Sequence, residues 1–136
     1  MPSPVLCIDD RLPVLALRKA NLETQGYSVV VASSGRAAMK ILEEMPVDAV
    51  LIEYRQEGMD AQAVAHHIKQ RHPQQPIVLL SAYSDMPETI LWLVDDYVLR
   101  SESVERLAQV IKQVSRSSEK FRPHSGAIPG SSSAIA

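Results

Sequence analysis

Short apolar runs alternate with longer amphipathic segments along this chain of 136 residues, a pattern typical of buried strands separated by helices. The runs that predict strands are residues 4–8, 27–32, 48–53, 77–80 and 97–99. The segments that predict helices are 11–25, 36–45, 61–72, 84–93 and 102–115. Regular alternation of this kind requires crossover connections, so the sequence predicts an α/β domain with a parallel sheet covered by helices on both faces.

Capping and breaking residues support the helix assignments. Pro13 lies in the first turn of the first helix, and Gly26 follows its end. Asp60 is placed to cap helix 61–72, and Ser101 is expected to cap the last helix. That last helix has apolar residues along one face, namely Val104, Leu107, Ala108, Ile111 and Val114.

The last twenty residues differ from the rest. Residues 117–136 are rich in Ser, Gly and Pro and have few large apolar side chains, so they cannot bury enough surface to offset the entropy of ordering. We therefore expect one compact domain over residues 1–116 and a flexible tail or linker remnant over 117–136.

Composition excludes several classes of protein. The net charge of -2, with a single Phe and a single Trp, gives no basic aromatic surface for nucleic acid. No apolar run is long enough for a membrane span, and the amino-terminal residues do not resemble a signal peptide. Cys7 is the only cysteine and lies in an apolar run, where a buried thiol is expected. These features predict a cytoplasmic protein without nucleic-acid or membrane partners.

Polar residues follow four of the predicted strands. Because the carboxyl ends of parallel strands meet at one edge of a sheet, where ligands bind, these residues should share one crevice. They are Asp9, Asp10, Glu53, Ser81 and Arg100.

Five short stretches, in order and at nearly the expected spacings, resemble the receiver domain of bacterial two-component response regulators. They are Val5–Asp10, Val47–Glu53, Gly58–Asp60, Leu80–Ala82 and Asp95–Arg100. The resemblance covers residues 4 to about 116 and implies a CheY-like, flavodoxin-like (βα)5 fold with a five-stranded, doubly wound parallel sheet.

The resemblance also implies roles for single residues. Asp9 and Asp10 match the pair that holds Mg²⁺ in the family, where the backbone carbonyl of Arg55 would add a ligand. Ser81 matches the hydroxyl that binds the phosphoryl group, and Tyr97 matches the aromatic that rotates on activation. Glu53 stands at the position of the aspartate that accepts the phosphoryl group from a histidine kinase.

Several positions depart from the family pattern. Glu53 replaces the acceptor aspartate, Arg100 the lysine, and Ser101 the proline that follows it, so the Arg100–Ser101 peptide should be trans. In the loop after the third strand, Glu57 replaces a proline and Ala61 a glycine. Ser81 and Arg100 are about three residues closer than usual, which predicts a shortened fourth helix.

The substitution at the acceptor position changes the chemistry. Glutamate extends its carboxylate by roughly 1.5 Å, and a misplacement of about 1 Å can slow a positioned reaction about a hundredfold. Transfer to Glu53 is therefore disfavoured, and any Mg²⁺ held by Asp9, Asp10, Glu53 and the Arg55 carbonyl should bind weakly. We expect Glu53 to pair with Arg100, with Ser81 nearby, as a partial imitation of the phosphorylated state.

The sequence supports three hypotheses about function. The first is a degenerate, or pseudo-, receiver that is not an enzyme, is not phosphorylated, and binds a histidine kinase or a downstream protein as a monomer or weak dimer. Its binding face would consist of the fourth helix, fifth strand and fifth helix. The second is a functional receiver in a Mg²⁺-dependent phosphorelay, and the third is a small-ligand site in the same crevice.

Two further groups of residues leave alternatives open. His66, His67 and His72, on or just after the third helix, indicate a solvated face rather than metal ligands, since no cysteine or nearby acid completes a tetrahedral set. Trp92 and Leu93 fit either packing in the core or at its edge or, with Tyr97 and the last helix, a patch that binds a partner.

Overall fold

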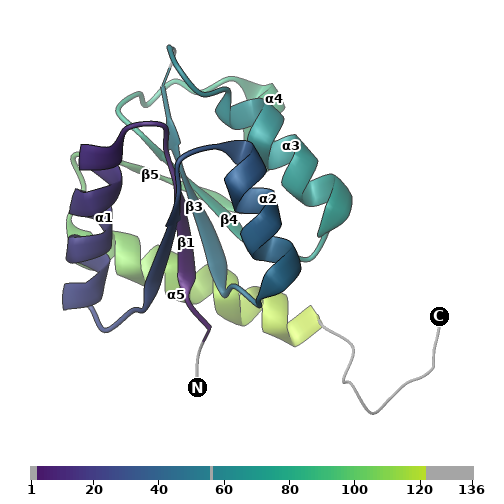
Figure 1. Ribbon diagram of the computed structural model, residues 1–136. Coiled ribbons are helices and arrows are strands. Elements are labelled where there is room, and N and C mark those ends of the chain that lie inside the picture. Colours follow the sequence, from purple (N-terminus) through teal and green to yellow (C-terminus); the bar gives the residue numbers. More distant parts are fainter. Residues whose placement is uncertain (1–2, 56, 122–136) are drawn as a thin grey trace.

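A computed structural model describes residues 3–55 and 57–121, and in it strands and helices alternate along the chain (Figure 1). The strands are β1 (Val5–Ile8), β2 (Val29–Ala32), β3 (Ala49–Tyr54), β4 (Ile77–Ser81) and β5 (Asp96–Leu99). The helices are α1 (Leu12–Thr24), α2 (Gly35–Glu44), α3 (Ala61–Arg71), α4 (Glu88–Leu91) and α5 (Val104–Phe121).

The strands form one parallel sheet in the order β2-β1-β3-β4-β5, which places β3 at the centre. Figure 1 shows α1 and α5 on one face of the sheet and α2, α3 and α4 on the other. A central parallel strand covered on both faces must be apolar throughout, and the first four residues of β3 are buried and apolar. This confirms the predicted flavodoxin-like fold.

Two hydrophobic cores lie on opposite faces of the sheet. On one side, Leu15 and Leu22 of α1 and Ile111 of α5 pack against β1, β3 and β4. On the other side, Ala65 and Ile68 of α3 pack against the same strands together with residues of α2 and α4. Cys7 is 1% exposed and belongs to the first of these cores, as predicted.

The fourth helix is short, as the close spacing of Ser81 and Arg100 along the chain predicted. It spans four residues, Glu88–Leu91, where the capping pattern predicted ten. Trp92 follows it directly and is 85% exposed, so the interpretation of Trp92 as a core residue was wrong. Leu93 is partly buried against the core, and the two residues therefore differ in role.

The last helix has different ends from those predicted. It begins at Val104, and the hydroxyl oxygen of Ser103 accepts a hydrogen bond from the Arg106 amide at 3.1 Å, so Ser103 is the cap rather than Ser101. The helix continues to Phe121, past the expected boundary at 116, and the remainder of the expected tail, 122–136, lies outside the described residues. No cis peptide occurs in the described chain, in agreement with a trans Arg100–Ser101 bond.

None of the helices within 3–55 and 57–121 combines the length and the apolar character that a membrane span requires.

The two candidate caps of α5 give a matched pair of variants. Ser103→Ala should lower the free energy of unfolding by about 1 kcal/mol, because the Arg106 amide then loses its side-chain partner. Ser101→Ala should change the free energy of unfolding by less than about 0.5 kcal/mol, since Ser101 is exposed and does not cap the helix. Urea unfolding followed by circular dichroism measures both, and equal effects would contradict this assignment of the cap.

Candidate functional site

The carboxyl edge of the sheet brings together the acids and the cation that the sequence placed there. Asp9 follows β1, Glu53 lies near the end of β3, and Arg100 follows β5. Asp9 is fully buried and Glu53 is 2% exposed. Charged groups buried to this extent require compensating charges or hydrogen bonds, so their partners define what the site can do.

Glu53 is held by two guanidinium groups. Arg100 donates from Nη2 to Oε1 at 2.9 Å, so the contact predicted from the sequence is present. Arg18 of α1 donates from Nε to Oε2 at 2.7 Å. Each carboxylate oxygen of Glu53 therefore accepts a charge-assisted hydrogen bond from a different arginine.

A third arginine holds the acidic pair. Arg55 donates through Nη2 to Oδ2 of Asp9 at 2.7 Å and through Nη1 to Oδ1, which is a two-pronged pair. The same Nη1 lies 3.5 Å from Oδ1 of Asp10. Planar guanidinium groups match carboxylates in this geometry, and the side chain of Arg55 is only 12% exposed.

Asp10 is oriented by the loop that follows β3. Its Oδ2 accepts a hydrogen bond from the Met59 amide at 2.9 Å. Gly58 precedes that amide with φ of +92°, and a Cβ at Gly58 would lie 2.6 Å from Oδ2 of Asp10. The loop reaches Asp10 so closely because position 58 has no side chain.

Burial by itself would raise the pKa of the Asp9 carboxyl. The hydrogen bonds and positive charge of Arg55, with smaller contributions from Asp10, outweigh that effect and hold the pKa of Asp9 below its usual range. Asp9 and Arg55 therefore behave as a persistent ion pair around neutral pH.

Ser81 makes its contacts away from Glu53. Its hydroxyl oxygen accepts a hydrogen bond from the Tyr83 amide at 2.9 Å and lies 3.3 Å from Sδ of Met86. Ser81 is completely buried. Its hydroxyl shapes the turn after β4, and it is not among the hydrogen-bond partners of Glu53 in the structure, which are both arginines.

The family pattern implies a magnesium ion at Asp9, Asp10, Glu53 and the Arg55 carbonyl, and the side chains as arranged do not fit one. Both oxygens of Asp9 and of Glu53 are engaged by arginines. Within residues 3–55 and 57–121, no group of three His, Cys, Asp or Glu side chains is placed to hold a metal ion. His66 and His67 are exposed, in line with a solvated face, and His72 is half-buried.

A cleft of about 350 Å³ lies beside these ion pairs. Arg11, Arg55 and Arg100 line it together with the rings of Tyr54 and Tyr83, which meet edge to face with centroids 6.1 Å apart. It is the place in the fold that corresponds to the small-ligand hypothesis.

The sequence did not predict the side-chain contacts of Arg18 with Glu53 or of Arg55 with Asp9. Arg55 was expected to contribute its backbone carbonyl, whereas its side chain makes the contacts with Asp9. Arg18 was not considered, although a signal exists: it is three residues after Leu15 and four before Leu22, both buried, so it lies on the inward stripe of α1. A cation on an inward stripe implies a buried anion opposite it.

Residues 5–112 match the family described as the response regulator receiver domain. Among curated relatives, the transcriptional regulatory protein GlrR of Escherichia coli (strain K12) is 32% identical over 65% of this chain and 20% of its own length. The alkaline phosphatase synthesis transcriptional regulatory protein PhoP of Bacillus subtilis (strain 168) is 29% identical over 92% of this chain and 53% of its own length. The chain therefore spans between about a fifth and about half of these relatives.

Solved structures show the same architecture. The response regulator protein TrrA from Thermotoga maritima, in complex with Mg(2+)-BeF, is 27% identical, covers 82% of this chain and 98% of its own, and superposes with a TM-score of 0.74. A response regulator receiver domain protein from Clostridium thermocellum is 22% identical, covers 88% of this chain and 99% of its own, and gives a TM-score of 0.77, which shows the likeness of fold.

The pairing of Glu53 predicts the effect of removing Arg18. Arg18→Ala should lower the free energy of unfolding by about 2–3 kcal/mol, because one oxygen of a buried carboxylate is left without its cation. Lys19→Ala is the matched control, since Lys19 pairs with Glu23 on the surface of the same helix and should contribute less than about 0.5 kcal/mol. Guanidinium unfolding measures both, and losses of similar size would contradict the role given to Arg18.

The low pKa of Asp9 predicts a pH dependence. A carboxyl whose pKa is lower in the folded than in the unfolded state stabilises the fold above the unfolded value of about 3.9 and loses that contribution as pH falls through the folded pKa. The destabilisation caused by Asp9→Asn or Arg55→Gln should therefore be largest near pH 7 and shrink below about pH 4. Urea unfolding at several pH values measures this gap, and a gap independent of pH would contradict the ion pair.

Proposed function

This chain belongs to the response regulator receiver domain family, and we propose that it acts in signal transduction as a pseudo-receiver, with Glu53 as a permanent charge instead of a phosphoryl acceptor. In this proposal the chain is not an enzyme. It transmits a signal by binding other proteins.

The pairing of Glu53 is the observation that carries the proposal. Phosphoryl transfer requires an oxygen of the acceptor to be free and in line with the phosphorus. In this structure Arg18 and Arg100 occupy the two oxygens of Glu53 at 2.7 and 2.9 Å, and the carboxylate is 2% exposed. Attack by Glu53 would first have to break one of these buried charge-assisted bonds, and it would then start from a displaced position.

The ion pair of Asp9 with Arg55 supports the same proposal. A divalent cation would have to displace the guanidinium of Arg55 from both oxygens of Asp9. The displaced Arg55 side chain, now 12% exposed, would then have to move into solvent or repel the ion, which weakens any binding of Mg²⁺. The positive charges that a metal ion supplies in the family are here supplied by side chains of the chain itself.

Glu53 and Arg100 reproduce part of the electrostatics of a phosphorylated receiver. One carboxylate has about half the charge of a phosphoryl group. Arg100 is drawn towards it, and the Arg100 amide donates to the carbonyl of Ser81 at 2.8 Å, which ties the end of β5 to the end of β4. The proposed pseudo-receiver is thus held in one charge state, independent of a kinase.

The proposed binding face consists of α4, β5 and α5. Trp92 and Tyr97 lie there and are 85% and 36% exposed, so this face offers aromatic surface that a partner can cover. A histidine kinase or a downstream signalling protein is the partner class that the family suggests. Tyr97 takes the role of the aromatic that reports the state of the site.

Incubation with acetyl phosphate and Mg²⁺, followed by intact-mass measurement, tests the proposal. We expect no gain of a phosphoryl group on the wild-type chain, because Glu53 is engaged on both oxygens. A stable gain of one phosphoryl group would overturn the proposal in favour of a functional phosphorelay receiver, and Glu53→Ala would then tell whether Glu53 or another residue accepts it. A receiver domain with an intact aspartate, treated in parallel, shows that the reagent is active.

A further inference from the structure

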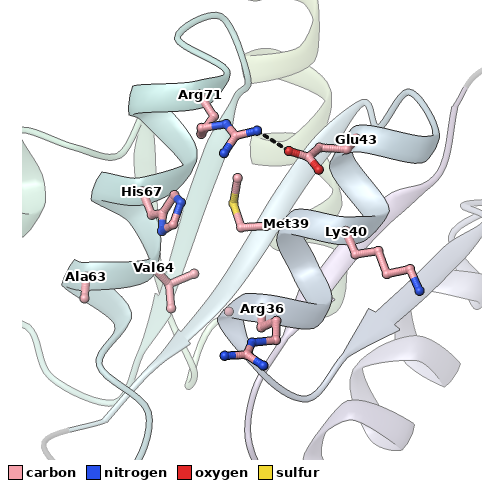
Figure 2. A pocket seen from close by; sticks show the side chains of 9 residues that line it. Arg36, Met39, Lys40, Glu43, Ala63, Val64, His67 and Arg71 are labelled. Atoms are coloured by element: carbon pink, nitrogen blue, oxygen red, sulfur yellow. Dashed lines mark hydrogen bonds and ion pairs between the residues drawn. The ribbon is translucent and has the colours of Figure 1, made fainter.

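A groove of about 530 Å³ separates α2 from α3, on the face of the sheet opposite α1 and α5 (Figures 1 and 2). Met39 and Val64 point into it from the two helices and form an apolar floor, with Ala63 at its edge. Its size is in the usual range for occupied pockets, about 300–1,000 Å³. The groove plays no part in the site at the carboxyl edge.

The rim of the groove is cationic. Arg36, Lys40 and Arg71 line it with His67, against a single carboxylate, Glu43. That carboxylate is already paired with Arg71. Neither Arg36 nor Lys40 has an ion-pair partner among the described side chains, so the groove offers unpaired positive charge beside an apolar floor.

An ion pair crosses the groove at one end. Figure 2 shows the Glu43–Arg71 ion pair spanning the gap between the two helices, while Arg36 lies towards the opposite end. Near that end Gly35 packs against Val64, where a Cβ would lie 3.0 Å from Cγ2. A long helix running through the groove would have to displace this ion pair. The groove favours a compact apolar group with a negative charge next to it.

The chain itself exposes such a group. Trp92 is the only tryptophan, and its side chain is 85% exposed just after α4. Glu88 lies four residues earlier on the same short helix, and the Trp92 amide donates to its carbonyl at 3.0 Å. Residues spaced by four on a helix share a face, so the indole and the Glu88 carboxylate project together.

We propose that the α2–α3 groove of one copy receives Trp92 of a second copy, with Glu88 of the second copy against Arg36 of the first. The two surfaces differ, so the contact is head to tail and can repeat from copy to copy. Tryptophan side chains that fill pockets are frequent anchors of protein–protein contacts. This inference does not depend on whether Glu53 accepts a phosphoryl group.

Another segment of the chain fits less well. Residues 122–136 contain no Asp or Glu, so they offer no acidic side chain to Arg36 and Lys40, and they contain no aromatic residue other than His124. The Trp92 of the same copy is not in the groove, because its side chain is 85% exposed. The second copy supplies both the apolar anchor and the carboxylate.

Trp92 provides a direct readout of the proposed contact. Sedimentation velocity of the wild-type chain between about 10 µM and about 1 mM should show concentration-dependent association, in the range of weak contacts. Over the same range the tryptophan emission should shift to shorter wavelength as the indole leaves water. Trp92→Ala should remain monomeric, and Arg36→Glu should associate at least about tenfold more weakly. Lys112→Glu, an equal charge change on the exposed face of α5, should associate like the wild type.

Mixing two variants distinguishes this contact from any other. Trp92→Ala keeps an intact groove, and Arg36→Glu keeps an intact anchor, so the mixture should form a one-to-one dimer that neither variant forms alone. Only the Arg36→Glu chain contains a tryptophan, and its emission should shift on mixing. The double variant Arg36→Glu with Glu88→Arg should recover self-association.

Several outcomes would overturn the inference. The wild-type chain could stay monomeric up to about 1 mM with unchanged emission. Association could also persist in Trp92→Ala, or the mixture of the two variants could fail to form a dimer while both remain folded by circular dichroism. In any of these cases the groove would serve another occupant, such as a small amphipathic anion. None of these results would affect the phosphorylation test of Glu53.

Discussion

A buried carboxylate at the end of the central strand needs positive charge around it, and this need organises the carboxyl edge of the sheet. Glu53 is 2% exposed, and the low-dielectric surroundings make an unpaired charge there expensive. Arg18 comes to it from α1 and Arg100 from the end of β5, on either side of β3. The ion pairs therefore join three elements that are distant in sequence, namely α1, β3 and the end of β5.

The negative charges of Asp9 and Asp10 are also compensated by donors from the chain itself. Arg55 faces Asp9 with two donors, and the Met59 amide holds Asp10 through a loop whose tight approach depends on Gly58. Three guanidinium groups thus neutralise three carboxylates. Accepting a divalent cation or a phosphoryl group at these carboxylates would break contacts already made. The charge state of the site is set by the sequence, which is the physical basis of the proposed pseudo-receiver.

Two features of the surface lie away from these ion pairs, namely the exposed Trp92 after α4 and the groove between α2 and α3. The chain between β4 and β5 forms only a four-residue helix, and it leaves Trp92 exposed directly after its last turn. The groove lies between α2 and α3, which share this face of the sheet with α4. Its cations Arg36 and Lys40 have no ion-pair partner among the described side chains. One chain therefore presents an aromatic anchor with an acid and a basic apolar groove, in different places on the same face of the sheet. This arrangement gives the domain a means of self-association that joins the groove of one copy to Trp92, on the α4 side, of another.

The sequence alone determined the fold, since strand runs such as the one ending at Glu53 are continuous and apolar, and a parallel sheet follows from their alternation with helices. It also placed Asp9, Glu53 and Arg100 at one edge, because the carboxyl ends of parallel strands meet there. Only the tertiary structure decided which cation meets which acid. Arg18 and Arg55 are long, flexible side chains whose direction depends on the packing of α1 and of the loop after β3, and local patterns do not encode that packing. For the same reason the exposure of Trp92 and the true cap at Ser103 became clear only when neighbouring elements were in place.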